Sequence, residues 1–192
     1  MQFGRNFRMQ LVSTLVSAAT ITAFWRDAGA ASWFKKDLTF DDEFRARFAA
    51  EHEAAANGEL DGWMNDAEGA LALLILLDQY PRNSFRGTAR MFATDGKALA
   101  VAKSAVECGF DTVVDPALRS FFYLPFEHSE ELENQDRALQ LFAPLGDEAQ
   151  RYAIIHRDII LRFGRFPHRN PLLGRATTRE EQQFLDAGGF AG

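Results

Sequence analysis

The chain has 192 residues, of which 47% are hydrophobic, and a formal net charge of −6. This length and composition can bury a substantial core, which excludes intrinsic disorder as the main state. The acidic balance argues against general binding to nucleic acid or to anionic membranes, so we expect neither as a partner. Because Cys108 is the single cysteine, an intramolecular disulfide and a cysteine-rich zinc site are excluded, and we expect a cytoplasmic protein.

The N-terminal stretch supports two interpretations. Basic residues precede a moderately apolar stretch over 11–24, which is a pattern of signal peptides. Trp25 and Trp33, however, are typical packing anchors of a folded domain. We therefore expect residues 1–8 to be a disordered extension and residues 9–192 to form a single all-helical domain. No run approaches the roughly 18 apolar residues that a membrane-spanning helix needs.

The elements predicted in the first half of the chain are helices delimited by caps and glycines. They are expected over about 12–27 with Gly29 closing the helix, from Thr39 to Gly58, and from Asn65 or Asp66 onward. Residues 70–77 are apolar on every side, which predicts a central buried helix. We expect this third helix to end in a turn marked by Pro81 and Gly87.

The second half continues with helices delimited by similar signals. They are expected from Thr88 or Thr94 to Gly109, from Asp115 to Pro125, from Ser129 to Pro144, from Asp147 to Phe163 and from Thr178 onward. No stretch alternates between polar and apolar residues over a convincing strand length. The sequence therefore predicts an all-α fold of about eight helices. A clean 34-residue repeat is not found, so periodicity alone does not indicate a tetratricopeptide array.

The segment 156–175 combines cationic groups with an apolar helical face. Residues 151–175 hold six arginines and one acid, a net charge of +5, so the remaining residues sum to −11. Arginine presents a rigid fork of donors that matches carboxylates and phosphates, and this cluster therefore indicates fixed pairing with anions. Helical periodicity places His156 within the apolar stripe, and Gly164 ends the helix so that an irregular segment follows.

Four segments with dense polar groups lie at or near predicted helix ends. We expect them to converge on a cleft that binds an anionic small molecule or a peptide carboxylate. The candidate ligand-binding residues are Asp78, Gln79, Arg82, Asn83, Arg86, Glu127, His128, Glu130, His156, Arg165, His168, Arg169 and Asn170. A buried carboxylate needs a cation or several donors, so Asp78 should have an arginine partner.

Two other interpretations stay open. One is a hydrolase-like or metal-assisted enzyme that uses His128, Glu127 and His156. His168 and Glu130 could complete a metal site, but the spacing matches no known motif and the nearby arginines would repel a divalent cation, so we predict no metal or other cofactor. The other interpretation is a protein-interaction scaffold in which the polar cluster is purely structural.

Several long stretches carry a family resemblance. They are Phe24–Gly29, Trp33–Asp37, Phe40–Asp41, Leu76–Thr88, Phe92–Asp95, Tyr123–Glu130 and Phe163–Asn170. From about residue 20 onward, the chain resembles an uncharacterised bacterial family, domain of unknown function 924. The resemblance implies an all-helical, tetratricopeptide-like fold, and it implies no established activity, substrate or cofactor.

Overall fold

The computed structural model describes residues 15–191, and the predicted extension over residues 1–8 lies outside them. The α-helices are α1 (Ala18–Ala28), α2 (Ala30–Trp33), α3 (Leu38–Asn57), α4 (Ala67–Leu74), α5 (Tyr80–Ser84), α6 (Asp95–Glu107), α7 (Phe110–Val113), α8 (Ser120–Glu127), α9 (Leu132–Phe142), α10 (Asp147–Phe163) and α11 (Arg179–Asp186). Eight of them have at least eight residues, and the described part of the chain contains no strand. The predicted all-α fold of about eight helices is confirmed, whereas its tetratricopeptide-like character stays a prediction.

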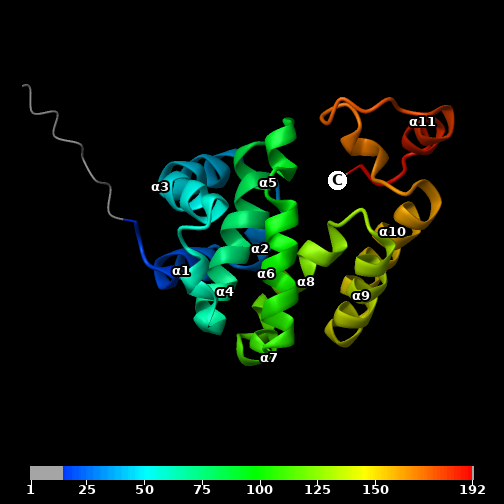
Figure 1. The fold of residues 1–192 in the computed structure, drawn as a ribbon. Helices are drawn as coiled ribbons and strands as arrows, with labels where there is room; N and C mark the ends of the chain where they lie inside the picture. Colours follow the sequence, from blue (N-terminus) through cyan, green and yellow to red (C-terminus); the bar gives the residue numbers. More distant parts are fainter. Residues whose placement is uncertain (1–14, 192) are drawn as a thin grey trace, which may run out of the picture.

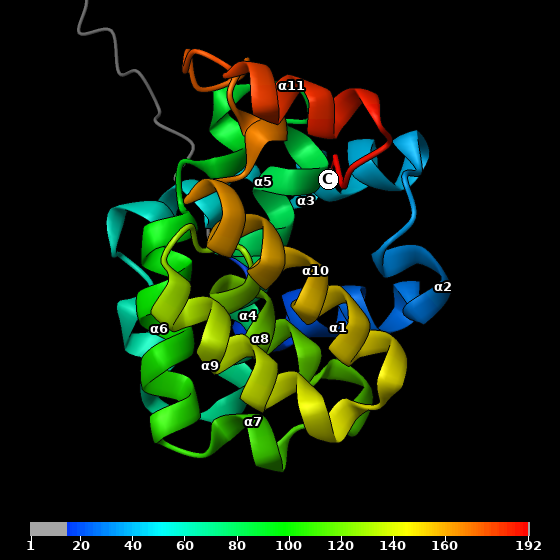
Figure 2. The ribbon, with the colours of Figure 1, turned by 90° about the vertical axis from the view of Figure 1, so that its right-hand side faces the viewer.

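The helices surround a central rod made of α4, a π turn at Ile75–Gln79, and α5. Figure 1 shows α1 and α3 on one side of the molecule and α9, α10 and α11 on the other, with α6 and α8 between them. Helix α4 packs against α1, α6 and α8, and α9 packs against α8 and α10. Figure 2 shows α9 and α10 side by side, with α11 near one end of α10.

The rod is the buried centre of the fold. Every residue from 70 to 77 is fully buried, as the uniformly apolar sequence predicts. Each large aliphatic side chain buried there stabilises the fold by roughly 1.5–3 kcal/mol relative to its exposed state. A smaller apolar cluster of Ile159, Ile160 and Phe166 lies under the C-terminal segment. No helix within residues 15–191 has both the length and the apolar character needed to cross a membrane.

The rod does not end in a turn at Pro81, where the sequence predicts one marked by Pro81 and Gly87, because side chains replace the missing backbone donor. Proline has no N–H, and the π turn displaces the normal hydrogen-bond pairing, so carbonyl groups one turn earlier need other partners. His52 Nδ1 donates to the carbonyl oxygen of Leu76 at 2.9 Å, and Thr94 Oγ1 donates to that of Leu77 at 2.5 Å. The helix therefore continues through Pro81 to Ser84.

Some of the predicted caps are correct and others are displaced. Asp66 caps α4, and Thr178 caps α11 in a capping box with Glu181. The predicted cap Thr39 is wrong, because the carboxylate of Asp37 accepts hydrogen bonds from the first backbone N–H groups of α3. The first helix begins at Ala18.

Helix α8 differs most from its prediction. It passes through Pro125 and ends at Glu127, because the packing of its seven buried residues, 121–127, outweighs the cost of one proline. Ser129 is also not the cap of α9, since that helix begins only at Leu132. As a consequence, Glu127 and His128 lie at the C-terminal end of a buried helix.

Candidate functional site

A cleft of about 740 Å³ is lined by residues of the π turn, α5, α8 and α10. It brings together part of the predicted site at the ends of α5 and α8 and on α10. The predicted residues that line it are Gln79, Arg82, Arg86, Glu127, His128 and His156. The rest of its lining is mainly apolar, with Ser120 and Glu148 as the polar exceptions. The other residues of this part are Phe34, Pro116, Ala117, Leu124, Phe142, Leu145, Ala149, Tyr152 and Phe190. The cleft therefore joins a polar edge to an apolar wall.

Asp78 lies behind the polar edge and is almost fully buried. One of its oxygens, Oδ1, is 2.7 Å from His128 Nδ1 and 3.0 Å from Arg82 Nη1. The other oxygen, Oδ2, accepts a hydrogen bond from Gln79 Nε2 at 2.6 Å. Burial raises the pKa of Asp78, but Arg82 and His128 outweigh this effect and bring it to about 2. Asp78 is therefore a carboxylate at neutral pH, and the predicted arginine partner is Arg82.

The imidazole of His128 is held in one orientation by Asp78. Burial and the charge of Arg82 lower the pKa of His128, which makes its ring neutral at pH 7. Because the carboxylate of Asp78 can only accept, Nδ1 of the ring carries the proton and donates it. In this tautomer Nε2 is unprotonated, and its lone pair can accept a hydrogen bond.

Glu127 and His156 form a second pair at the same edge. Glu127 Oε1 is 3.2 Å from His156 Nδ1, and this nitrogen donates a hydrogen bond to the carbonyl oxygen of Tyr152 at 2.9 Å. Burial and then the charge of Asp78 raise the pKa of Glu127 to about 8. Burial lowers the pKa of His156 to about 3. The carboxyl of Glu127 therefore keeps its proton at pH 7, beside a neutral imidazole.

Arg86 is the most exposed cation of the polar edge, with 35% of its side chain accessible. Its Nε and Nη2 donate to the buried carboxylate of Asp41 at 2.8 and 3.3 Å. Asn83 lies behind the cleft and donates to the same carboxylate at 2.6 Å. Asp41 therefore accepts from Nε and Nη2 of Arg86, and Nη1 takes no part in this pairing.

Arg169 is a structural cation rather than part of the cleft lining. Its guanidinium lies between the rings of Phe92 and Phe166, with its central carbon 4.6 and 4.4 Å from their centroids. It donates to the carbonyl oxygen of His128 at 3.0 Å and to Asp95 at 3.3 Å. Burial, opposed by Asp95, lowers the pKa of Arg169 to about 10, so the cation persists at neutral pH.

Asp95 is a site residue that the sequence analysis missed. Its two oxygens accept hydrogen bonds from Arg82 Nη1 and Nη2 at 2.8 and 3.1 Å, and one of them also contacts Arg169. Asp95 therefore connects the arginine beside Asp78 to the arginine behind His128. Its sequence signal was that of an acid in the first turn of α6, which is typical of helix starts and does not indicate a site.

The remaining predicted residues do not line the cleft: Glu130 lies between α8 and α9, and Arg165, His168 and Asn170 lie in the segment that follows α10. Arg175 pairs with Glu130 at 2.6 Å, and Arg165 pairs with the buried Glu181 at 2.6 Å. Asn170 donates to Glu181 at 3.3 Å. Five of the six arginines in residues 151–175 therefore pair with anions, as the composition indicates, and these anions are carboxylates of the protein itself.

His168 also belongs to this C-terminal packing. Its ring centroid is 5.6 Å from that of Phe166 and 5.7 Å from that of Phe190. Burial and the charge of Arg169 lower its pKa to about 4. Among residues 15–191, no group of three or more histidine, cysteine, aspartate and glutamate side chains is arranged to hold a metal ion.

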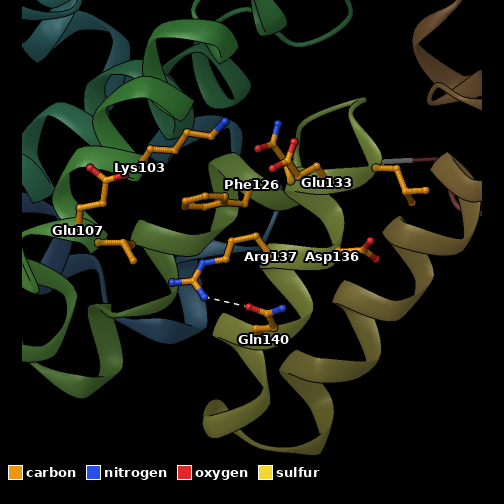
Figure 3. Close-up of a pocket in the computed structure, with 10 residues that line it drawn as sticks. Lys103, Glu107, Phe126, Glu133, Asp136, Arg137 and Gln140 are labelled. Atoms are coloured by element: carbon orange, nitrogen blue, oxygen red, sulfur yellow. Dashed lines mark hydrogen bonds between the residues drawn. The ribbon is translucent and has the colours of Figure 1, made fainter.

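Figure 3 shows a second hollow, of about 670 Å³, between α6 and α9. It carries charges of both signs, including Lys103, Glu107 and Arg137, and none of the predicted site residues line it. Arg137 Nη1 donates to Gln140 Oε1 at 2.9 Å. Arg137 thus lines this second hollow in the way that Arg86 lines the cleft, and it is not one of the residues that line the cleft.

The chain was compared with known proteins. A family model described as a bacterial protein of unknown function, DUF924, matches residues 21–189. The chain belongs to this family. A solved structure of a protein of unknown function from Agrobacterium tumefaciens is 54% identical, with a TM-score of 0.87, over 89% of this chain and 97% of that chain. None of the curated proteins in the comparison matches this DUF924 chain.

Proposed function

We propose that the cleft binds a small organic anion that joins a carboxylate or phosphate group to an apolar portion. The observation that carries this proposal is the position of Arg86, whose Nη1 is left free by Asp41, at the polar edge of a cleft with an apolar wall. A volume of about 740 Å³ lies within the range of small-molecule sites and favours a metabolite over a long peptide.

The charges of the polar edge support an anion bound at Arg86 rather than at Arg82. Arg82 already contacts two carboxylates, those of Asp78 and Asp95, and only 14% of its side chain is accessible. Arg86 has one carboxylate partner and is more exposed. A charge-assisted hydrogen bond to a guanidinium contributes roughly 1.5–3 kcal/mol. Gln79 and His128 Nε2 offer further polar contacts, and the apolar wall removes water from the bound molecule.

The acidic composition and the single cysteine support a cytoplasmic location. A ligand of this kind would then be drawn from the soluble metabolites of the cell. The proposal concerns binding alone and does not require catalysis.

The test is calorimetric titration of the purified protein with a panel of small dicarboxylates, monocarboxylates with an apolar tail, and phosphate monoesters. We expect saturable binding that weakens about tenfold or more in Arg86→Gln, because the guanidinium fork is lost. Arg86→Lys, which keeps the cation beside Asp41, should also weaken binding. Arg137→Gln, in the second hollow, is the matched control and should bind like the unaltered protein.

Two results would overturn the proposal. One is the absence of saturable heat with every member of the panel. The other is binding that Arg137→Gln weakens and Arg86→Gln leaves unchanged, because this would place the anion in the second hollow. Thermal melting of each variant shows whether it is folded before the titrations are compared.

A further inference from the structure

We infer that the same cleft is a general acid–base site that hydrolyses a carboxylic ester, with His128 as the base, Asp78 as the residue that orients it, and Glu127 as the acid. The inference rests on the proposed function, because it uses the same bound anion.

The side chain and the backbone of His128, the base, each have a hydrogen-bond partner. Asp78 holds Nδ1 of the His128 ring at 2.7 Å, and Arg169 holds the carbonyl oxygen of His128 at 3.0 Å. A carboxylate that accepts the Nδ1 proton directs the other ring nitrogen to the substrate and stabilises the imidazolium that forms during the reaction. Asp78 thus acts as a positioning residue, whereas His128 contacts the reacting atoms.

The acid comes from the residue next to the base. Glu127 is a buried carboxyl on the cleft lining, and its Oε1 lies 3.2 Å from Nδ1 of His156. The protonated carboxyl can donate a proton to a leaving group. A base kept neutral beside an acid kept protonated is the arrangement that general acid–base catalysis near neutral pH requires.

The charged and titratable groups around this pair come from several elements. Asp78 of the π turn, Arg82 of α5 and Asp95 of α6 act on the pKa of His128, and Asp78 also acts on that of Glu127. His156 of α10 contacts Glu127 directly. Arg169 contacts Asp95 and the backbone of His128, while Glu148 of α10 lines the cleft.

The reaction balances with water as the single co-reactant. A water oxygen attacks the ester carbonyl carbon while His128 Nε2 accepts a proton from that water. The bond between the carbonyl carbon and the alkoxy oxygen then breaks, and the alkoxy oxygen takes the proton of Glu127. The products are a carboxylic acid and an alcohol. The proton held by the His128 imidazolium returns to the Glu127 carboxylate through solvent, which restores the starting state.

Arg86 narrows the substrate class. A guanidinium donor on the cleft lining would hold a second carboxylate of the same molecule while the ester carbonyl lies at His128. The substrate class is therefore the half-ester of a small dicarboxylic acid.

The test uses two half-esters of succinate, the 4-nitrophenyl ester and the methyl ester. The nitrophenolate group departs without a proton, whereas methoxide requires one. We expect the unaltered protein to hydrolyse both. His128→Gln and Asp78→Asn should lower kcat/KM for both esters by about 100-fold or more, and Glu127→Gln should do so for the methyl ester alone. Arg137→Gln should leave both rates unchanged.

Two results would overturn the inference. In the first, the unaltered protein hydrolyses both esters no faster than His128→Gln does. In the second, Glu127→Gln lowers kcat/KM equally for the two esters. If Asp78→Asn does not fold, the contrast between His128→Gln and Glu127→Gln still decides. Calorimetric binding of succinate without turnover of either ester would refute this inference alone, whereas absence of both binding and turnover would also refute the proposed function.

Discussion

Glu127→Gln should change how the stability of the fold depends on pH. Glu127 has a pKa of about 8 in the folded protein against 4.5 for an ordinary glutamate, so between these values the folded protein holds a proton that the unfolded chain releases. Such a group makes stability fall as pH rises, by up to 1.36 kcal/mol per pH unit, until the folded pKa is reached. From pH 6.5 to 8 the free energy of unfolding should fall by about 1.5 kcal/mol through this group.

The assay is urea unfolding at pH 6.5, 7.25 and 8 on the unaltered protein and on Glu127→Gln. Glutamine cannot ionise, so the free energy of unfolding of the variant should lack this fall. The free energy of unfolding of the variant minus that of the unaltered protein should therefore rise by about 1.5 kcal/mol from pH 6.5 to 8. Histidines titrate in both proteins, and the comparison removes their contribution. Glu130→Gln is the control: Arg175 helps to lower the pKa of Glu130, so its titration lies below this range. Parallel profiles for the unaltered protein and Glu127→Gln would refute the reasoning.

Three further substitutions test the packing at two glycines and one buried ion pair. Gly69→Ala should destabilise the fold by about 1–3 kcal/mol, because the added Cβ would lie 2.0 Å from the carbonyl oxygen of Trp63. Gly96→Ala on α6 adds its Cβ in open space and should stabilise the fold by about 0.4–1 kcal/mol. Equal urea midpoints for the two variants would contradict this pair of predictions. Glu181→Gln should lower stability at pH 7 by about 1–3 kcal/mol, because Arg165 loses its carboxylate. The hydrogen bonds from Arg165 help to lower the pKa of Glu181 to about 2, so the stabilisation that its carboxylate provides is complete above pH 4.5 and is lost as pH falls through 2. If the free energies of unfolding of the unaltered protein and Glu181→Gln stay as far apart at pH 2 as at pH 7, this prediction is wrong.

The helices could be predicted from local signals, and the exceptions have local causes. A cap such as Asp66 and an apolar run such as 70–77 act within one or two turns, so their effect is visible in the sequence. Continuation through Pro81 depends on His52 and Thr94, which reach the rod from other elements. The spacing of residues around Pro81 carries no information about these partners.

The same limit applies to the candidate site. The sequence indicates that Asp78 needs an arginine, and the i,i+4 spacing to Arg82 makes that pair a neighbour on one helix. The contact between Asp95 and Arg169 joins residues 74 positions apart, and only the packing of the helices brings them together. The arginine-rich segment was informative about pairing, but its composition could not distinguish a ligand from carboxylates such as Glu181.

The central claim is that a neutral His128 keeps its proton on Nδ1 and offers Nε2 to the cleft. Nitrogen-15 NMR of the histidine rings at pH 7 tests this directly, with the His128 signal assigned through His128→Gln. We predict a neutral ring protonated at Nδ1, and a change of tautomer or pKa in Asp78→Asn. An imidazolium at pH 7, or a neutral ring protonated at Nε2, would contradict the account.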